Sequence, residues 1–167
     1  ATHVRQEQSN DLLDLRMHCL DRRLAEFDAL LEALTVQPSP TAVEQAAVLV
    51  SRLRPIDRCA DPKALRARVP PPEDPDTDEV VEAVRAELRR AEPLRRLQRV
   101  DDALEVVQST AAGLQTMRYP PIEAEVQLAL GLSLDAAGDD EAASEALEEA
   151  LVRGLGAQAA LLAVETF

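Results

Sequence analysis

Two cysteines and two histidines are the residues of this chain whose side chains most readily bind a metal ion or form a covalent link. They are Cys19, Cys59, His3 and His18, and their spacing matches no recognised zinc pattern. Because His18 and Cys19 are adjacent, their side chains point about 100° apart on a helix and would not easily hold one ion. Two interpretations of the cysteines stay open: two buried small hydrophobic residues, or a disulfide that closes a loop of about forty residues. We predict no bound metal ion and no cofactor.

Acidic and hydroxyl side chains offer no reaction centre. The run Asp139-Asp140-Glu141 could bind calcium, but the calcium-loop pattern is missing and the position suits the start of a helix. The serines have no nucleophile elbow and no neighbouring histidine, and no glycine-rich loop could hold a phosphate. We therefore expect no catalytic activity from this chain.

Basic side chains are concentrated in one region. Residues 85–99 contain six arginines against two glutamates, whereas residues 119–152 contain nine acids and no base. A row of arginines can hold carboxylates through charge-assisted hydrogen bonds. The alternative is that these charges form solvated helix faces that attract each other.

Composition limits the classes of protein to consider. The 167 residues are 46% hydrophobic, which is enough for a core, but only 2% aromatic, which fits a β-sandwich or barrel poorly. The formal net charge of −13 repels phosphate backbones and anionic lipids, so we expect no nucleic-acid partner. No apolar run reaches the roughly 18 residues of a membrane helix, so we expect no membrane insertion. The fold class predicted is all-α.

An N-terminal helical hairpin is predicted over residues 1–54. Its first helix carries an apolar stripe at helical spacing, and its second helix carries another. The first stripe is Leu13, Leu20, Leu24, Phe27, Leu31 and Leu34, and the second is Val43, Ala46, Ala47, Val50 and Leu53. Pro38 and Pro40 separate the two helices, and Thr41 with Glu44 reads as a capping box.

A proline-rich connector is predicted over residues 55–76, because six prolines there leave room for at most a short turn of helix around 63–68. Asp76 or Thr77 would cap the next helix. The stripe of that helix is Val81, Val84, Leu88, Ala91 and Leu94.

Residues 77–167 contain two similar segments, which align when residue 103 is placed on residue 143. Small residues recur at Ala91 and Gly131, and turns are expected at Gln98-Arg99 and Gly138-Asp139. This spacing resembles the tetratricopeptide repeat, whose antiparallel helix pairs stack into a solenoid, although the large aromatic residues of that family are absent. The resemblance implies about two repeats, with a third begun at 157–167. The alternative is an ordinary helical bundle.

The repeat resemblance implies a peptide-binding face, since the first helix of each unit lines the concave side of the solenoid. Arginines there would hold a peptide carboxylate. The candidate peptide-binding residues are Arg85, Arg89, Glu92, Arg96, Glu125, Leu128, Leu132 and Asp135.

Four strings resemble the helical region of myxobacterial-type serine/threonine protein kinases, between their membrane-spanning helix and their tetratricopeptide repeats. They are VRQEQS (4–9), LLDLRMHCLDRRL (12–24), CADP (59–62) and LRARVPPP (65–72). The resemblance implies a non-catalytic sensory or protein-binding segment of a larger kinase, since no kinase catalytic motif occurs here. The alternative is a helical signalling domain of a multidomain transcription regulator.

The same resemblance bears on the cysteines and on the location of the chain. A Cys19–Cys59 bridge would be chemically sensible if the parent kinase is tethered to a membrane with this region outside the cytoplasm; otherwise the region is cytoplasmic. Both ends of the chain look cut, so we expect a fragment. Its last helix, which carries Leu161, Leu162 and Val164, would need a neighbour and could form a homo-oligomer.

Overall fold

All secondary structure in the described part of the chain is helical, which confirms the predicted all-α class. The computed structural model describes residues 2–66, 72, 74–114 and 118–164, with backbone only at 2–9 and 158–164. The helices are α1 (Thr2–Thr35), α2 (Pro40–Ser51), the 3₁₀ helix η1 (Ile56–Cys59), α3 (Pro62–Arg66), α4 (Pro75–Arg96), α5 (Val100–Gly113), α6 (Pro120–Ala137) and α7 (Asp140–Val164).

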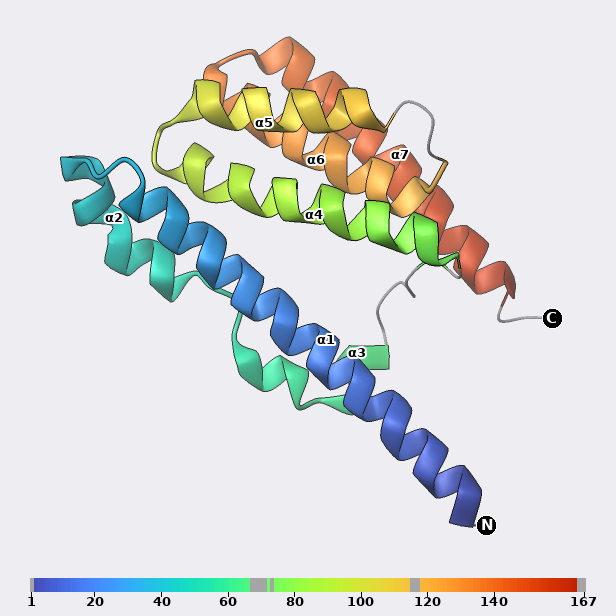
Figure 1. Ribbon diagram of the computed structural model, residues 1–167. Helices are drawn as coiled ribbons and strands as arrows, with labels where there is room; N and C mark the ends of the chain where they lie inside the picture. The colour runs from blue at the N-terminus through green and yellow to red at the C-terminus, as the bar shows by residue number, and fades with distance from the viewer. Residues whose placement is uncertain (1, 67–71, 73, 115–117, 165–167) are drawn as a thin grey trace.

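Helices α4 to α7 pack side by side, and α1 crosses beside α4 (Figure 1). Each of these four helices packs against the next in the chain, and α4 also contacts α6. Their shared core contains Val81 and Val84 from α4, Leu114 after α5, and Ile122 and Val126 from α6. Apolar residues at helical spacing thus draw α4, α5 and α6 into one cluster.

The forty-residue period of the sequence reappears in the two turns of this array. Gln98, after α4, has a φ of 63°, and Gly138, after α6, has a φ of 81°. Both left-handed residues allow the following amide to bond back to the end of the helix. The matching hydrogen bonds are Arg99 N to Leu94 O (2.9 Å) and Asp139 N to Leu134 O (3.0 Å).

Small residues set the closest helix approach. A Cβ atom on Gly131 would lie 2.7 Å from Leu147 Cγ and 3.1 Å from the carbonyl oxygen of Ala143. Ala103 and Ala143, which the sequence alignment places together, are both buried. Glycine therefore allows α6 and α7 to pack more closely than any side chain would permit.

Two helix starts differ from the sequence prediction. Ser39, not Thr41, caps α2 by accepting a hydrogen bond from the amide of Ala42 (3.0 Å). Asp74, not Asp76 or Thr77, caps α4, and hydrogen bonds from the hydroxyl and amide of Thr77 lower the pKa of its carboxyl group. In both cases a proline occupies the first turn, where its missing amide costs nothing, and the cap is the polar residue before it.

The two apolar stripes that mark the predicted hairpin lie mostly at the surface. Leu13, Leu24 and Leu31 of α1 are 47–59% exposed, and Val43 of α2 is 75% exposed. The hairpin instead packs through Leu30, Ala33, Ala42 and Leu49, which join Leu97 after α4 in a second core. The α1 helix has two apolar faces, and the face with smaller residues allows α2 and α4 to come close.

The connector packs against α1 through η1 and α3. Leu65 of α3 is buried in a cluster with both cysteines, and Leu12 and Leu15 of α1 pack against this cluster. The predicted short helix around 63–68 is present in part as α3, while 67 and 68 lie outside the described residues.

The last helix is longer than the sequence indicated. α7 continues from Asp140 to Val164 as one helix, where the repeat resemblance implied that a third unit begins at 157–167. Gly154 and Gly156 lie within this helix without interrupting it. The side chains of Leu161, Leu162 and Val164 lie outside the described residues.

Candidate functional site: an arginine cleft

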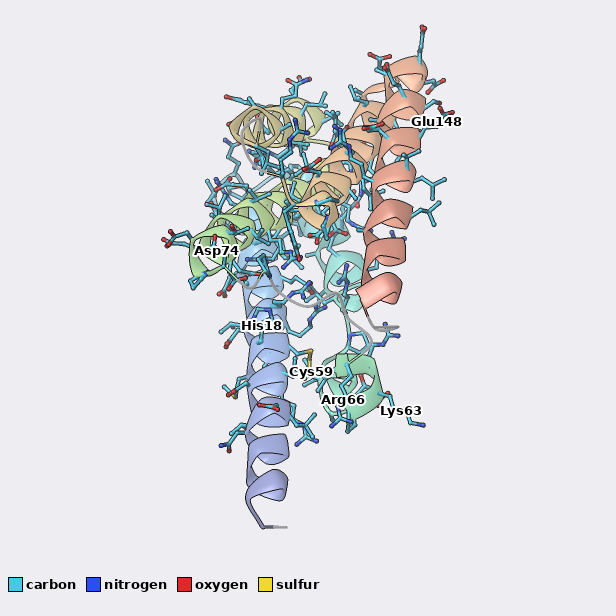
Figure 2. The ribbon with its side chains drawn as sticks, turned by 90° about the vertical axis from the view of Figure 1, so that its right-hand side faces the viewer. His18, Cys59, Lys63, Arg66, Asp74 and Glu148 are labelled. Atoms are coloured by element: carbon cyan, nitrogen blue, oxygen red, sulfur yellow. A yellow bond between two sulfur atoms is a disulfide. The ribbon has the colours of Figure 1, made fainter. Side chains whose placement is uncertain are left out.

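The two cysteines are joined in a disulfide, which is the bridged alternative of the two that the sequence left open. Cys19 lies on α1 and Cys59 on η1, with their Cα atoms 5.6 Å apart. Both are almost fully buried. His18 is exposed on a different side of α1 from the bridge (Figure 2). Among the described residues, no three His, Cys, Asp or Glu side chains gather in a way that could hold a metal ion.

A cleft of about 180 Å³ lies between the α1–α2 hairpin and helices α4 and α6. We name it the arginine cleft, because its lining has six arginines and three glutamates beside five apolar residues. The lining residues are Arg22, Glu26, Leu30, Leu49, Arg52, Leu53, Arg54, Arg85, Leu88, Arg89, Glu92, Pro93, Arg96 and Glu125. It is a locally basic site in a chain whose net charge is −13.

The arginine cleft continues toward the disulfide. A second hollow of about 450 Å³ shares Arg22, Arg54 and Arg85 with it and adds Arg23 and Arg58. Together the linings of the two hollows reach from Arg96 at the end of α4 to Arg58 and Cys59 of η1.

Arg85 is the best-fixed cation of the site. Its Nη2 and Nε lie 2.7 and 3.1 Å from Oε1 and Oε2 of Glu125, and its Nη1 lies 3.0 Å from Oε1 of Glu82. Burial disfavours the charge of Arg85, but the hydrogen bonds and attraction of Glu125 and Glu82 outweigh it and raise the pKa of the guanidinium. Nearby, burial raises the pKa of the Tyr119 phenol.

The other predicted arginines pair with glutamates of their own helix, α4. Arg89 Nη1 lies 3.9 Å from Oε2 of Glu82, and Arg96 Nη2 lies 2.7 Å from Oε1 of Glu92. The Arg96–Glu92 pair joins residues one turn apart on the surface of α4, where such pairs contribute little to stability. A stronger carboxylate ligand could therefore replace Glu92 at small cost.

The structure gathers five of the eight predicted peptide-binding residues in the arginine cleft. The five are Arg85, Arg89, Glu92, Arg96 and Glu125. Leu128, Leu132 and Asp135, on the later turns of α6, do not line it.

The opposite wall of the cleft was missed by sequence reasoning. It consists of α1 and the end of α2, with Arg22, Arg52 and Arg54 as its cations. The signal was present as the arginine-rich run 52–58, but that run was assigned to the end of the hairpin and the start of the connector. Only the packing of α1 against α4 brings it to the site.

The lining of the arginine cleft suits recognition of anions. Among the described residues, its lining side chains are Arg, Glu, Leu and Pro, so it offers paired guanidinium groups beside apolar contact. Carboxylates match this geometry because an arginine can donate two parallel hydrogen bonds to them.

Comparisons of the chain with protein-family models, with curated proteins and with solved structures found no match. Among the described helices, none is both long and apolar enough to cross a bilayer.

Proposed function

We propose that this chain is a non-catalytic interaction segment that binds an acidic peptide in the arginine cleft. By its sequence resemblance it serves as a sensory or scaffolding region of a larger serine/threonine protein kinase. The observation that carries the binding proposal is a cleft lined by six arginines in a chain of net charge −13. A basic cleft in an acidic chain is explained better by the binding of an anionic partner than by a contribution to the stability of the fold.

We also propose that α4–α7 form two tetratricopeptide-like hairpins. Three observations support this interpretation: the forty-residue offset between the two turns, the close approach at Gly131, and the packing of each helix on its neighbour. Repeat hairpins of this kind present extended binding surfaces. Here the first helices of the two units, α4 and α6, contribute Arg85, Arg89, Arg96 and Glu125 to the cleft.

Peptide is favoured over nucleic acid because of the charge on the rest of the molecule. The net charge of −13 repels a long polyanion, whereas a short acidic segment can be confined to the cleft. Leu30, Leu53 and Leu88 add apolar contact beside the guanidinium groups. An acidic peptide with one or two aliphatic residues matches both features.

In the proposed binding, a carboxylate of the peptide replaces a glutamate of the chain as the partner of an arginine. Arg54 is 65% exposed and lies 3.9 Å from Glu26, so an incoming carboxylate can reach it without unfolding any helix. Arg96 exchanges Glu92 for the ligand in the same way. Arg85 keeps its hydrogen bonds to Glu82 and Glu125 and provides a fixed positive charge in the cleft.

The test is the binding of a fluorescently labelled Glu- and Leu-containing peptide, followed by anisotropy. Arg89→Ala with Arg96→Ala should weaken binding at least about tenfold, because each charge-assisted hydrogen bond is worth roughly 1.5–3 kcal/mol. Arg90→Ala is the matched control: Arg90 lies on the same helix but pairs with Glu87 outside the cleft.

Two outcomes would contradict the proposal. One is unchanged peptide affinity in the double variant, and the other is an equal loss in Arg90→Ala. The kinase context has a separate test, which is the sequence encoded before Ala1: kinase catalytic motifs there support it, and their absence contradicts it.

A further inference from the structure

The α1 helix carries an exposed apolar stripe that no part of the described chain covers. Six large side chains, each 41–59% exposed, follow one another at alternating steps of four and three residues. They are Leu13, Met17, Leu20, Leu24, Phe27 and Leu31. Exposed leucines occur singly on most proteins, but a contiguous row of six marks an interaction surface.

The spacing of this stripe is that of a coiled-coil seam. Steps of four and three residues place the side chains at alternating d and a positions of a seven-residue repeat, sustained over three heptads. The a positions are Asn10, Met17, Leu24 and Leu31, and the d positions are Leu13, Leu20 and Phe27. Such a seam is complementary to a second seam of the same spacing.

We propose that α1 joins two copies of this chain in a parallel, in-register coiled coil over residues 10–31. The proposal is independent of peptide binding in the arginine cleft. A second copy is the favoured occupant because the charges that flank the seam are self-complementary, as follows.

The positions beside the seam carry opposite charges at the required offset. In a parallel pair, each g residue faces the e residue five positions later in the partner helix. Arg16 is at g and Asp21 is at e, five residues later, so each copy would offer its Arg16 to Asp21 of the other. In an antiparallel pair the same residues would place like charges together. The e positions Asp14 and Asp28 are also acidic and exposed.

Arg16 is the flanking cation that is available for this contact. Arg16 is partly buried on α1, whereas Asp21 is exposed. Arg23, at the next g position, is 7% exposed and donates to Glu26 of its own chain, so it stays within the fold.

The fold leaves space for a second helix at this seam. The N-terminal part of α1 extends beyond the α4–α7 array (Figure 1 and Figure 2). Cys19 and Glu26, which face η1 and the arginine cleft, lie about a third of a turn from the stripe around α1. Pairing of α1 through the stripe therefore does not use Cys19 or Glu26.

Equilibrium sedimentation of the full chain tests the proposal. We expect a dimer, and a monomer for Leu20→Glu with Leu24→Glu. Leu151→Glu with Val152→Glu is the matched control, since these α7 residues are 62% and 66% exposed and lie off the seam. Circular dichroism should show unchanged helix content, because none of the four side chains is part of a core. A monomeric native chain, or a dimer abolished by the α7 variant instead, overturns the proposal.

Charge exchange tests the orientation and does not depend on the leucine variants folding. Arg16→Asp and Asp21→Arg should each raise the dimer dissociation constant about tenfold, because each replaces two attractive pairs by two repulsive ones. The double variant should restore the native value. Single variants with unchanged association contradict the parallel register.

Discussion

At the scale of single residues, Gly131 determines how closely α6 and α7 can approach. Gly131→Ala should lower the free energy of unfolding by about 1 kcal/mol, although alanine is the better helix former, because the new Cβ would lie 2.7 Å from Leu147 Cγ. Chemical denaturation followed by circular dichroism measures the change.

Gly154 in α7 provides the matched control. A Cβ there meets only Ala124 Cβ at 3.9 Å, an ordinary contact. Gly154→Ala should therefore stabilise the chain by up to about 1 kcal/mol through helix propensity alone. Equal effects of the two substitutions would contradict the close packing inferred at Gly131.

The disulfide gives a second prediction at this scale. Reduction, or Cys19→Ser with Cys59→Ser, should lower the free energy of unfolding by roughly 4 kcal/mol, because the bridge closes a loop over a separation of 40 residues. Denaturation with and without a dithiol reductant measures it. The double serine variant should not respond to the reductant, and a native chain that is equally indifferent would show that the bridge does not constrain it.

The sequence located the chemistry of the arginine cleft only in part. Arg85, Arg89 and Arg96 could be predicted because they recur on one face of one helix. Arg22, Arg52 and Arg54 could not be predicted, because they reach the site through packing between α1 and α4, which local periodicity does not encode.

At the scale of elements, the two equivalent turns differ in one residue. Gln98 adopts a left-handed φ of 63°, where Gly138 has 81°. Gln98→Gly should stabilise the chain by about 1 kcal/mol, because glycine lacks the Cβ that disfavours this backbone region. Gly138→Ala should destabilise it by a similar amount. Thermal unfolding of the two variants gives the comparison, and changes of the same sign would refute the equivalence of the turns.

The sequence was sufficient to predict that these helices exist. It was not sufficient to predict where α2 and α4 begin or which face of α1 packs against other helices. Period and turn residues identified α1, α2 and α4–α7. Pro40 and Pro75 moved the caps to Ser39 and Asp74, which precede them. The sequence located the apolar stripe of α1 but not what covers it, because periodicity identifies an apolar face without its partner, and α1 has two such faces.

At the scale of the whole molecule, two surfaces share α1, one of them charged and the other apolar. One side of the helix contributes Arg22 and Glu26 to the arginine cleft, and another carries the exposed heptad stripe. A dimer through the stripe would present two clefts at once, and two linked sites bind a multivalent acidic partner more tightly than one.

The proline-rich run explains why the packing of the N-terminal helices against α4 could not be predicted from the sequence. Residues 55–76 read as a connector between separate units, yet η1 and α3 pack on α1, and α1 packs on α4. Prolines exclude a long helix but do not exclude short helices with a buried leucine such as Leu65.

Photo-crosslinking of an acidic peptide to the chain tests the central claim most directly. A peptide that carries a photoreactive side chain beside its glutamates should form adducts with the arginine cleft, at Leu30, Leu53 or Leu88, and unlabelled peptide should suppress them. Adducts that map to α5 or to the exposed face of α7, at Leu155 for example, would contradict the account.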